Sequence, residues 1–292
     1  MLMQLVITGI LIGGIYAVIS IGLSLIFGVM RIINFAHGEF LMFGMYGSFW
    51  MFYLLGVHPY MSILIVAPIA FVVGVLIYKA VIQPSMKKGT TVVVLVTVGL
   101  SVLMQNLALF LWKSDFRTMD IAIASKNIQI GSIFIPLASL VAFTAATIVT
   151  VVLWLFLNNS HMGRAIRATA QNKQTSQLMG INVEKTFLIT FGLGSVLVTV
   201  GASLISPILA VFPSIGVNMV MVCFVIVVLG GLGSIPGAWV GGVIIGLIDA
   251  LAGFYFSSEV KQIIFFALFI SIMVFMPAGL FGVKGSQEVG MK

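Results

Sequence analysis

The chain has 292 residues, of which 61% are hydrophobic and only 7% are charged. A soluble domain carries about 25% charged residues, so this composition excludes a water-exposed globule and indicates a membrane protein. The net charge of +7 is typical of basic cytoplasmic loops, and we expect no nucleic-acid partner. Cys223 is the only cysteine, which excludes an intrachain disulfide and a thiolate metal cluster.

Long apolar runs between charged and turn residues predict an all-α, polytopic transmembrane bundle that forms a single domain over 1–292. A run of about 20 apolar residues crosses the hydrocarbon layer as a helix, and the short alternating strands of a barrel are absent. We expect about 8–9 spans, including broken or half helices such as the short run 218–232. The predicted spans are 4–29, 40–56, 60–79, 91–112, 132–157, 187–211, 218–232, 236–256 and 260–277.

The first polar interruption is RIINFAHGEF, residues 31–40. Asn34 can N-cap a helix that begins at Phe35, and Glu39 would then favour the positive end of the helix dipole. We expect Arg31 and Glu39 near the cytoplasmic interface, where a charge costs little. Either the segment is a capped turn, or it is a broken helix that lines a transport path. The residues of this possible translocation path or helix break are Asn34, His37, Gly38 and Glu39.

Basic residues predict the orientation of the bundle. The loops 80–90 and 158–186 and the C-terminal tail, with Lys284 and Lys292, carry most of the lysines and arginines. Alternating spans place these segments on one side, which the positive-inside rule assigns to the cytoplasm. We therefore expect the N-terminus outside and the C-terminus in the cytoplasm.

The loop 158–186 is longer than a connection between adjacent spans requires. Its composition predicts a helix over 164–178, then Gly180 in the left-handed conformation, then Asn182 as the N-cap of the next helix. Such an amphipathic helix either lies on anionic lipid or docks into a cytoplasmic partner, and its residues alone favour neither. The candidate docking residues are Arg164, Arg167, Gln171, Asn172, Met179, Gly180, Ile181 and Asn182.

A second interruption, GGLGSIPG over 230–237, also lies between apolar runs. A shift of 202 residues superposes Gly28 on Gly230, which is compatible with an internal repeat that has a discontinuous helix in each half. The residues of this second possible path or helix break are Gly230, Gly231, Gly233, Ser234 and Pro236. Glycine pairs elsewhere, such as Gly9 with Gly13 and Gly242 with Gly246, have the spacing of helix–helix packing.

Few other polar groups lie within the spans. We expect Asp249 to face the outer interface or a partner subunit. No span shows a convergent charged cage that matches the ammonium and carboxylate of an amino acid. His37 has only Glu39 near it at ligand spacing, so we expect no metal site.

Five blocks resemble a known family in order and spacing over nearly the whole chain. They are GLSLIFGVMRIINFAHGEFLMFGMY, VTVGLSVLMQNLALFL, GRAIRATAQNKQTSQLMGINVEKTF, GGLGSIPGAWVGG and FMPAGLFG. The chain resembles the membrane-spanning permease subunits of ABC importers for branched-chain amino acids. The resemblance implies that the loop around Gly180 couples the permease to an ATPase.

The resemblance also implies an assembly in a bacterial-type plasma (inner) membrane. Its expected partners are a second, homologous permease subunit, two cytoplasmic ATP-binding subunits and an external solute-binding protein. The chain has no GxxxxGK[ST] phosphate loop, so we expect it to bind no cofactor, with ATP and Mg²⁺ on the ATPase subunits. The implied solute is a branched-chain amino acid or a related small polar solute, and related permeases for urea or short amides are an alternative.

Transporters of another class remain an alternative. An ion-coupled secondary transporter would need acidic groups in mid-span, and only Asp249 and Glu39 qualify. A channel would need a repeated filter motif, and an enzyme would need a nucleophile–base or metal constellation. The sequence shows neither, so we expect a transport subunit without enzymatic activity.

Overall fold

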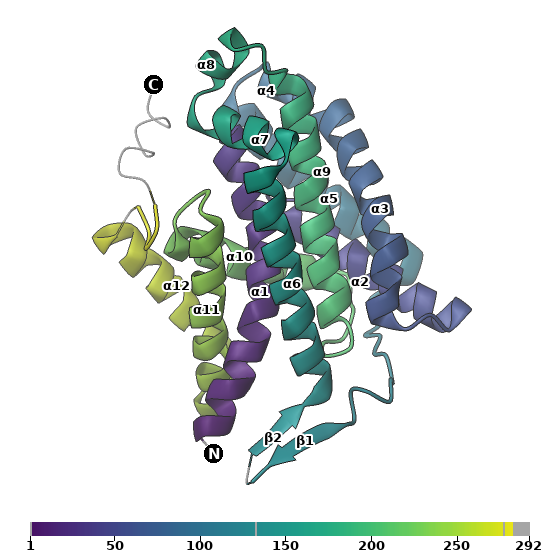
Figure 1. Cartoon of the computed structure of the whole chain (residues 1–292). Coiled ribbons are helices and arrows are strands. Elements are labelled where there is room, and N and C mark those ends of the chain that lie inside the picture. Colours follow the sequence, from purple (N-terminus) through teal and green to yellow (C-terminus); the bar gives the residue numbers. More distant parts are fainter. Residues whose placement is uncertain (1, 132, 277, 283–292) are drawn as a thin grey trace.

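The computed structural model describes residues 2–131, 133–276 and 278–282, and within them one short hairpin interrupts a helical bundle (Figure 1). The first half contains α1 (Leu2–Met30), α2 (His37–Leu55), α3 (Pro59–Ile77), the π-helical turn η1 (Tyr78–Ile82), α4 (Gln83–Met86) and α5 (Thr90–Trp112). The second half contains β1 (Asn127–Ile130), β2 (Ile133–Pro136), α6 (Leu137–Asn159), α7 (His161–Gln171), α8 (Lys173–Leu178), α9 (Val183–Ile205), α10 (Ile215–Gly230), α11 (Ile235–Tyr255) and α12 (Ser258–Phe275).

The helical membrane bundle predicted from composition is confirmed. Six helical stretches are long and apolar enough to cross a bilayer: α1, α3 continued to Met86, α5, α6, α9 and α11. The apolar helix α10 has only 16 residues. At 1.5 Å per residue it extends about 24 Å, less than the roughly 30 Å of hydrocarbon, as expected for a half helix.

Two predicted boundaries are wrong. The span expected over 132–157 begins only at Leu137, because Asn127–Ile130 and Ile133–Pro136 form an antiparallel hairpin around Gly131, whose φ is 62°. The span expected over 60–79 ends too early, since the helix continues to Met86. The wider π turn η1 lies immediately before Pro84, and it accommodates the backbone position where proline cannot continue α-helical hydrogen bonding.

Helix α1 is buried along most of its length and lies at the centre of the bundle (Figure 1). It packs closely against α11 through two pairs of glycines. A Cβ on Gly9 would lie 2.9 Å from the carbonyl oxygen of Gly246, and a Cβ on Gly13 would lie 2.7 Å from that of Gly242. The predicted packing role of these small residues is therefore confirmed.

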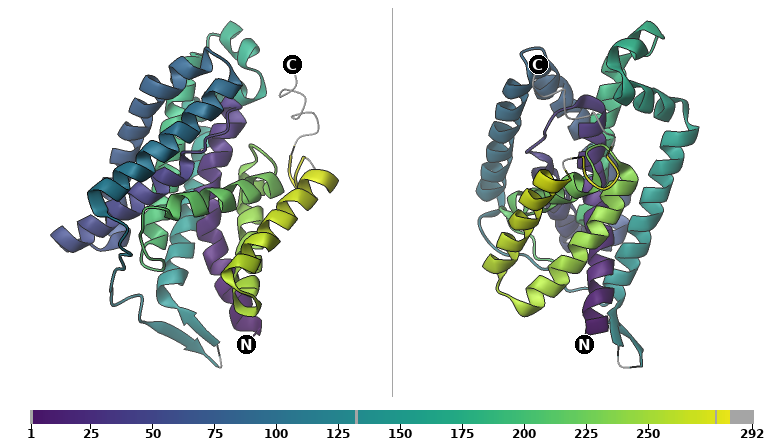
Figure 2. Two further views of the ribbon diagram at one scale, coloured as in Figure 1. Left: turned by 180° about the vertical axis from the view of Figure 1, so that it is seen from behind. Right: turned by 90° about the vertical axis from the view of Figure 1, so that its left-hand side faces the viewer.

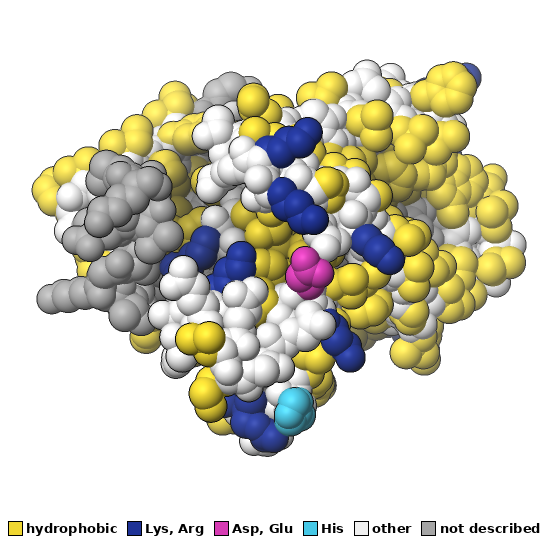
Figure 3. Space-filling model, turned by 90° about the horizontal axis from the view of Figure 1, so that it is seen from above, with side chains coloured by type: hydrophobic (Ala, Val, Ile, Leu, Met, Phe, Trp, Pro, Cys, Tyr) yellow, Lys and Arg dark blue, Asp and Glu magenta, His cyan; other side chains and the backbone are white. Residues whose placement is uncertain are grey.

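The molecule has two distinct ends along its length. Helices α4, α7 and α8 lie at one end, and the N-terminus and the hairpin lie at the other (Figure 1). Lysine and arginine side chains are spread over the first end, which we call the basic end (Figure 3). The two basic loops thus lie on one side, as expected. The predicted contribution of Lys284 and Lys292 falls outside the described residues.

Two segments repeat the order helix, loop, short helix and run in opposite directions. Helix α1 runs toward the basic end and leads to α2, whereas α9 runs away from it and leads to α10, which lies across the bundle (Figures 1 and 2). The start of α2 lies against the start of α10, where Gly38 contacts Gly216. The internal repeat predicted from the shift of 202 residues stays a prediction.

Candidate functional site

Helices α2 and α10 begin at the same point in the interior. A Cβ on Gly216 would lie 2.7 Å from the carbonyl oxygen of Gly38 and 2.6 Å from Oε2 of Glu39. We call this point the helix junction and define it by Asn34, His37, Gly38, Glu39 and Gly216. Both helices start here, so the junction brings the positive ends of two helix dipoles together.

Asn34 shapes the approach to α2 but does not cap it. Its Oδ1 accepts a hydrogen bond from the N–H of Ala36 at 3.2 Å, and the helix starts at His37 with Ala36 as its N-cap. The expected start at Phe35 is wrong, because that ring instead packs on Phe224 with 5.2 Å between centroids. Asn34 therefore closes a local turn that directs the chain inward.

Glu39 lies in the first turn of α2, as expected, but deep in the protein. It is 1% exposed, and its Oε1 accepts a hydrogen bond of 3.0 Å from Oγ of Ser101 on α5. Among the described residues, its Oε2 and the Nδ2 of Asn34 have no hydrogen-bond partner. The expected place near the interface is wrong for Glu39, since residues 31–36 carry the chain inward before α2 begins.

Arg31 and His37 occupy different environments. Arg31 stays at the basic end, where Nη2 donates to the carbonyl oxygen of Ala170 on α7 at 3.4 Å. His37 is 1% exposed, and its Nε2 lies 2.9 Å from the carbonyl oxygen of Ile19 on α1. Within the described residues no group of three His, Cys, Asp or Glu side chains could hold a metal. His37 therefore ties α2 to α1.

The second predicted break is a tight glycine turn between α10 and α11, and its backbone is hydrogen-bonded. Gly231 and Gly233 have φ of 99° and 87°, and Ser234 Oγ caps α11 by accepting from the N–H of Gly237 at 3.1 Å. Pro236 lies in the first turn of that helix. The carbonyl groups of Leu229 and Gly230, at the end of α10, accept hydrogen bonds from the backbone of Leu280 and Phe281.

The two predicted breaks are not brought together. The helix junction lies at the start of α10 and Gly230 at its end, so about 24 Å of helix separates them. Beside the second break, a cavity of about 250 Å³ is lined by Ser234 and Pro236 together with Ile166 and Arg167 of α7. This break therefore borders the loop at the basic end.

That loop contains two helices, α7 and α8, where one over 164–178 was expected. The single-helix prediction is wrong, because Asn172 leaves the helical conformation and caps α8, accepting from the N–H of Thr175 at 2.9 Å. Arg164 and Arg167 donate to the carbonyl oxygens of Asn159 and Asn158, at 2.9 and 3.5 Å. Both arginines thus stabilise the C-terminal end of α6.

The turn after α8 has the predicted geometry. Gly180 adopts a left-handed φ of 81°, and Asn182 caps α9 by accepting from the N–H of Lys185 at 3.0 Å. Ile181 donates its N–H to Ser176, which closes the turn. Gln171 is exposed at the end of α7. Leu178 and Met179 are 88% and 78% exposed, so an apolar tip projects at the basic end (Figure 1).

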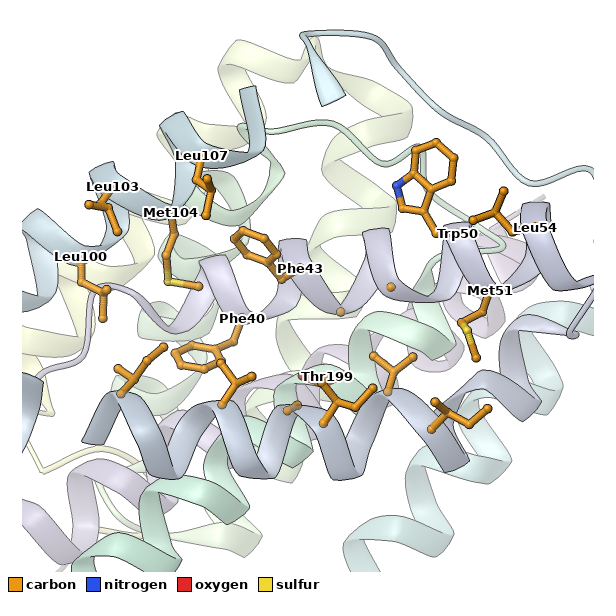
Figure 4. Close-up of a pocket in the computed structure, with 18 of the residues that line it drawn as sticks. Phe40, Phe43, Trp50, Met51, Leu54, Leu100, Leu103, Met104, Leu107 and Thr199 are labelled. Atoms are coloured by element: carbon orange, nitrogen blue, oxygen red, sulfur yellow. The ribbon is translucent and has the colours of Figure 1, made fainter. Parts of the chain in front are cut away.

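An apolar cavity of about 750 Å³ lies between α2, α3 and α5 (Figure 4). Its walls are aliphatic and aromatic, with Phe40, Phe43 and Trp50 from α2 and Leu103 from α5. A site for a polar solute needs convergent hydrogen-bonding groups. These walls supply almost none, so the cavity is not a candidate solute site.

The sequence reasoning missed an ion pair in the half of the molecule opposite the basic end. Asp249 on α11 and Lys261 on α12 lie 2.6 Å apart, and the hydroxyl of Tyr16 lies 3.5 Å from the same carboxylate. The sequence reasoning did not bring Asp249 and Lys261 together, and the expectation that Asp249 faces the outer interface or a partner subunit stays a prediction. The signal was that only Phe256 and Ser257 separate the two helices, which places their neighbouring ends side by side.

Comparison with known proteins assigns this architecture to a family. A family model described as "Branched-chain amino acid transport system / permease component" matches residues 5–273. The chain belongs to this family. It is a transport permease of the ABC importer type, a multi-pass protein of the inner membrane and not an enzyme.

Similar permeases occur in bacteria and archaea. The high-affinity branched-chain amino acid transport system permease protein LivH of Salmonella typhimurium is 33% identical over 305 residues, covering 98% of this chain and 97% of the relative. The corresponding protein BraD of Pseudomonas aeruginosa is 29% identical and covers 98% of both chains. A probable LivH of Methanocaldococcus jannaschii is 26% identical, covering 91% of this chain and 88% of the relative. No solved structure matches this permease.

Proposed function

We propose that this permease moves branched-chain amino acids, or a related small polar solute, inward after delivery by an external solute-binding protein. The observation that carries the proposal is similarity over 98% of the chain to permeases named for branched-chain amino acid transport. The match covers 97% and 98% of the two relatives' own lengths, which supports the same mode of action.

The proposed assembly pairs the permease with a second, homologous permease subunit and two cytoplasmic ATP-binding subunits, which hold ATP and Mg²⁺. The exposed tip formed by Leu178 and Met179 supports this arrangement. Exposed apolar side chains beside water mark protein contact sites, and methionine is enriched in such contacts. The loop 158–186 is thus the proposed coupling surface, and Arg164 and Arg167 act in it by holding α7 on α6.

The helix junction is the proposed constriction of the solute path. Half helices whose N-termini meet inside a membrane protein form solute sites in other transporters. Here the junction supplies a buried carboxylate, Glu39, and a buried amide, Asn34, each with an atom that lacks a partner among the described residues. Unpaired buried groups of this kind are costly, and a polar solute would satisfy them during passage.

A mechanical connection joins the coupling surface to the path. Helix α7 contacts the end of α1 through the bond between Arg31 and Ala170, and it borders the glycine break through Arg167. The break in turn joins α10 to α11. Movement of α7 would therefore displace α1 and α10. Helix α10 begins at the junction, and α1 holds His37 there.

Two measurements test the proposal. Affinity purification of the tagged permease from its native cells should recover two ATP-binding subunits and a second permease. Calorimetric titration of the cognate binding protein should show binding of leucine, isoleucine or valine. Recovery of the chain without an ATPase would contradict the proposed assembly, and binding only of urea or short amides would contradict the proposed solute.

A further inference from the structure

A polar cavity of about 270 Å³ lies between α1, α10, α11 and α12, away from the helix junction's buried carboxylate. Its polar lining comes from one side chain or two on each helix. These are Tyr16 on α1, Asn218 on α10, Asp249 on α11, and Lys261 and Gln262 on α12. Unlike the apolar cavity of Figure 4, it offers both charges and amides to a ligand.

The charged pair lies at the surface of the cavity and is only partly shielded. Nζ of Lys261 is 2.6 Å from Oδ1 of Asp249, and the side chains are 29% and 12% exposed. The second carboxylate oxygen has one weak contact, 3.5 Å from the Tyr16 hydroxyl. The ammonium can therefore turn to a new anion, and the carboxylate can accept from a new cation, without either charge leaving the cavity.

The remaining wall is apolar. Val222 and Val225 of α10 face the cavity, and Phe265 and Phe266 of α12 lie one turn beyond Lys261. This volume is at the lower limit of about 300 Å³ for small-molecule pockets, a size that suits a ligand smaller than a drug. A carboxylate, an ammonium and an aliphatic wall together match the three parts of a zwitterionic aliphatic amino acid.

The position of the cavity connects it to the path. Val217 and Asn218 line it, and they follow Gly216, which contacts Gly38 at the helix junction. Asp249 and Lys261 lie near the adjoining ends of α11 and α12, on the side of the molecule opposite α7 and α8 (Figures 1 and 2). A solute in this cavity would thus lie before the junction on an inward route.

We propose that this cavity is a transient binding site for the solute, which exchanges partners with the ion pair. The ammonium of the amino acid binds Asp249, its carboxylate binds Lys261, and its side chain packs on Phe265 and the valines of α10. When the solute leaves, the two protein charges pair again, so the empty site keeps no unpaired charge. The inference rests on the proposed function, since it assumes a zwitterionic solute.

The test uses the complete complex in proteoliposomes, with the cognate binding protein and radiolabelled leucine. The double variant Asp249→Asn with Lys261→Gln removes both charges together, so no unpaired charge is left to destabilise the fold. We expect it to assemble with the ATPase subunits and to import leucine at least about tenfold more slowly, since charged hydrogen bonds at both ends of the solute are lost.

A matched control comes from the other ion pair among the described side chains. Asp115, whose side chain is 66% exposed, lies 3.9 Å from Arg117 in the loop after α5. Asp115→Asn should import leucine at the wild-type rate. Wild-type import by the double variant at Asp249 and Lys261 would overturn the inference, because the pair would then only join α11 to α12.

If the complex with the neutral pair does not assemble, a second variant tests the inference. The exchange Asp249→Lys with Lys261→Asp keeps an ion pair between the helices but reverses the charges toward the cavity. Assembly with strongly reduced leucine import supports the inference, and import at the wild-type rate overturns it. The proposed function itself is tested with the wild-type complex alone. It would be wrong if that complex imported urea or amides but no leucine, isoleucine or valine.

Discussion

Gly38 of α2 and Gly216 of α10 lie against each other, so two helices from opposite halves of the chain begin at one point. Any larger residue at Gly216 would collide with the carbonyl group of Gly38 or with Oε2 of Glu39, at 2.7 and 2.6 Å from its Cβ. This contact holds the carboxylate beside the start of both helices. The proposed path depends on it.

Gly216→Ala should destabilise the permease by about 1–3 kcal/mol, the usual cost of forcing a methyl group into a packed interior. The side chain of Glu39 can turn aside, but the carbonyl oxygen of Gly38 belongs to the backbone and cannot. Thermal unfolding of the purified permease in detergent measures the effect.

Gly253→Ala is the matched control for that substitution. It also lies in a helix, α11, but a Cβ there meets nothing within 4 Å. Since alanine favours helix over glycine by about 0.5–1 kcal/mol, this variant should unfold at the same temperature as the wild type or higher. Equal destabilisation at both positions would contradict the packing at the junction.

Glu39→Gln should slow solute import about tenfold or more without loss of assembly. The variant keeps the size of the side chain but removes the negative charge of Oε2, which has no partner among the described residues. A hydrogen bond to a charged group contributes about 1.5–3 kcal/mol, enough for such an effect. Initial uptake rates per assembled complex provide the measurement.

Ser101→Ala is the control for Glu39. It removes the hydroxyl that donates to Oε1 at 3.0 Å but leaves the charge in place. Import should fall less than in Glu39→Gln, since the negative charge that would meet the solute stays in place. Full import by Glu39→Gln together with a strong loss in Ser101→Ala would show that the carboxylate only supports packing.

Leu178→Asp and Met179→Asp should release the ATP-binding subunits while the permease stays folded. Both side chains are exposed, at 88% and 78%, so an acid there disturbs no internal packing. Its charge would oppose burial against a partner. Pull-down of the ATPase by the tagged permease measures the loss. Ser125→Asp, an exposed position before the hairpin, is the control and should retain the ATPase.

Asn182→Ala should lower the stability of the start of α9 by about 1 kcal/mol, because the N-cap bond to Lys185 is lost. Asn182→Asp keeps an acceptor oxygen at the same place and should behave like the wild type. Hydrogen exchange of the amides in the first turn of α9 reports the difference. Equal protection in both variants would show that the cap does not hold this turn.

Local chemistry predicted much of this fold. Long apolar runs predicted the spans, and Gly180 and Asn182 were predicted because a left-handed turn and an N-cap depend on neighbouring residues only. The glycine pairs were recognised by their spacing. In the same way, the shortness of 218–232 indicated the half helix α10.

Long-range contacts were less predictable. The depth of Glu39 depends on how residues 31–36 turn inward, and its partner Ser101 is 62 residues away. The junction depends on Gly216, a residue that no sequence motif distinguished from other glycines. The pair of Asp249 and Lys261 required knowledge that α11 and α12 form a hairpin, so that two isolated charges meet.

This chain should conduct its solute only as part of an ATP-driven importer. Proteoliposomes containing the complete complex, the cognate binding protein outside and ATP inside measure it most directly. We expect leucine uptake that requires internal ATP and the binding protein. We expect no leucine uptake by the permease alone under a proton or sodium gradient. Gradient-driven uptake by the permease alone would contradict it and favour a secondary transporter.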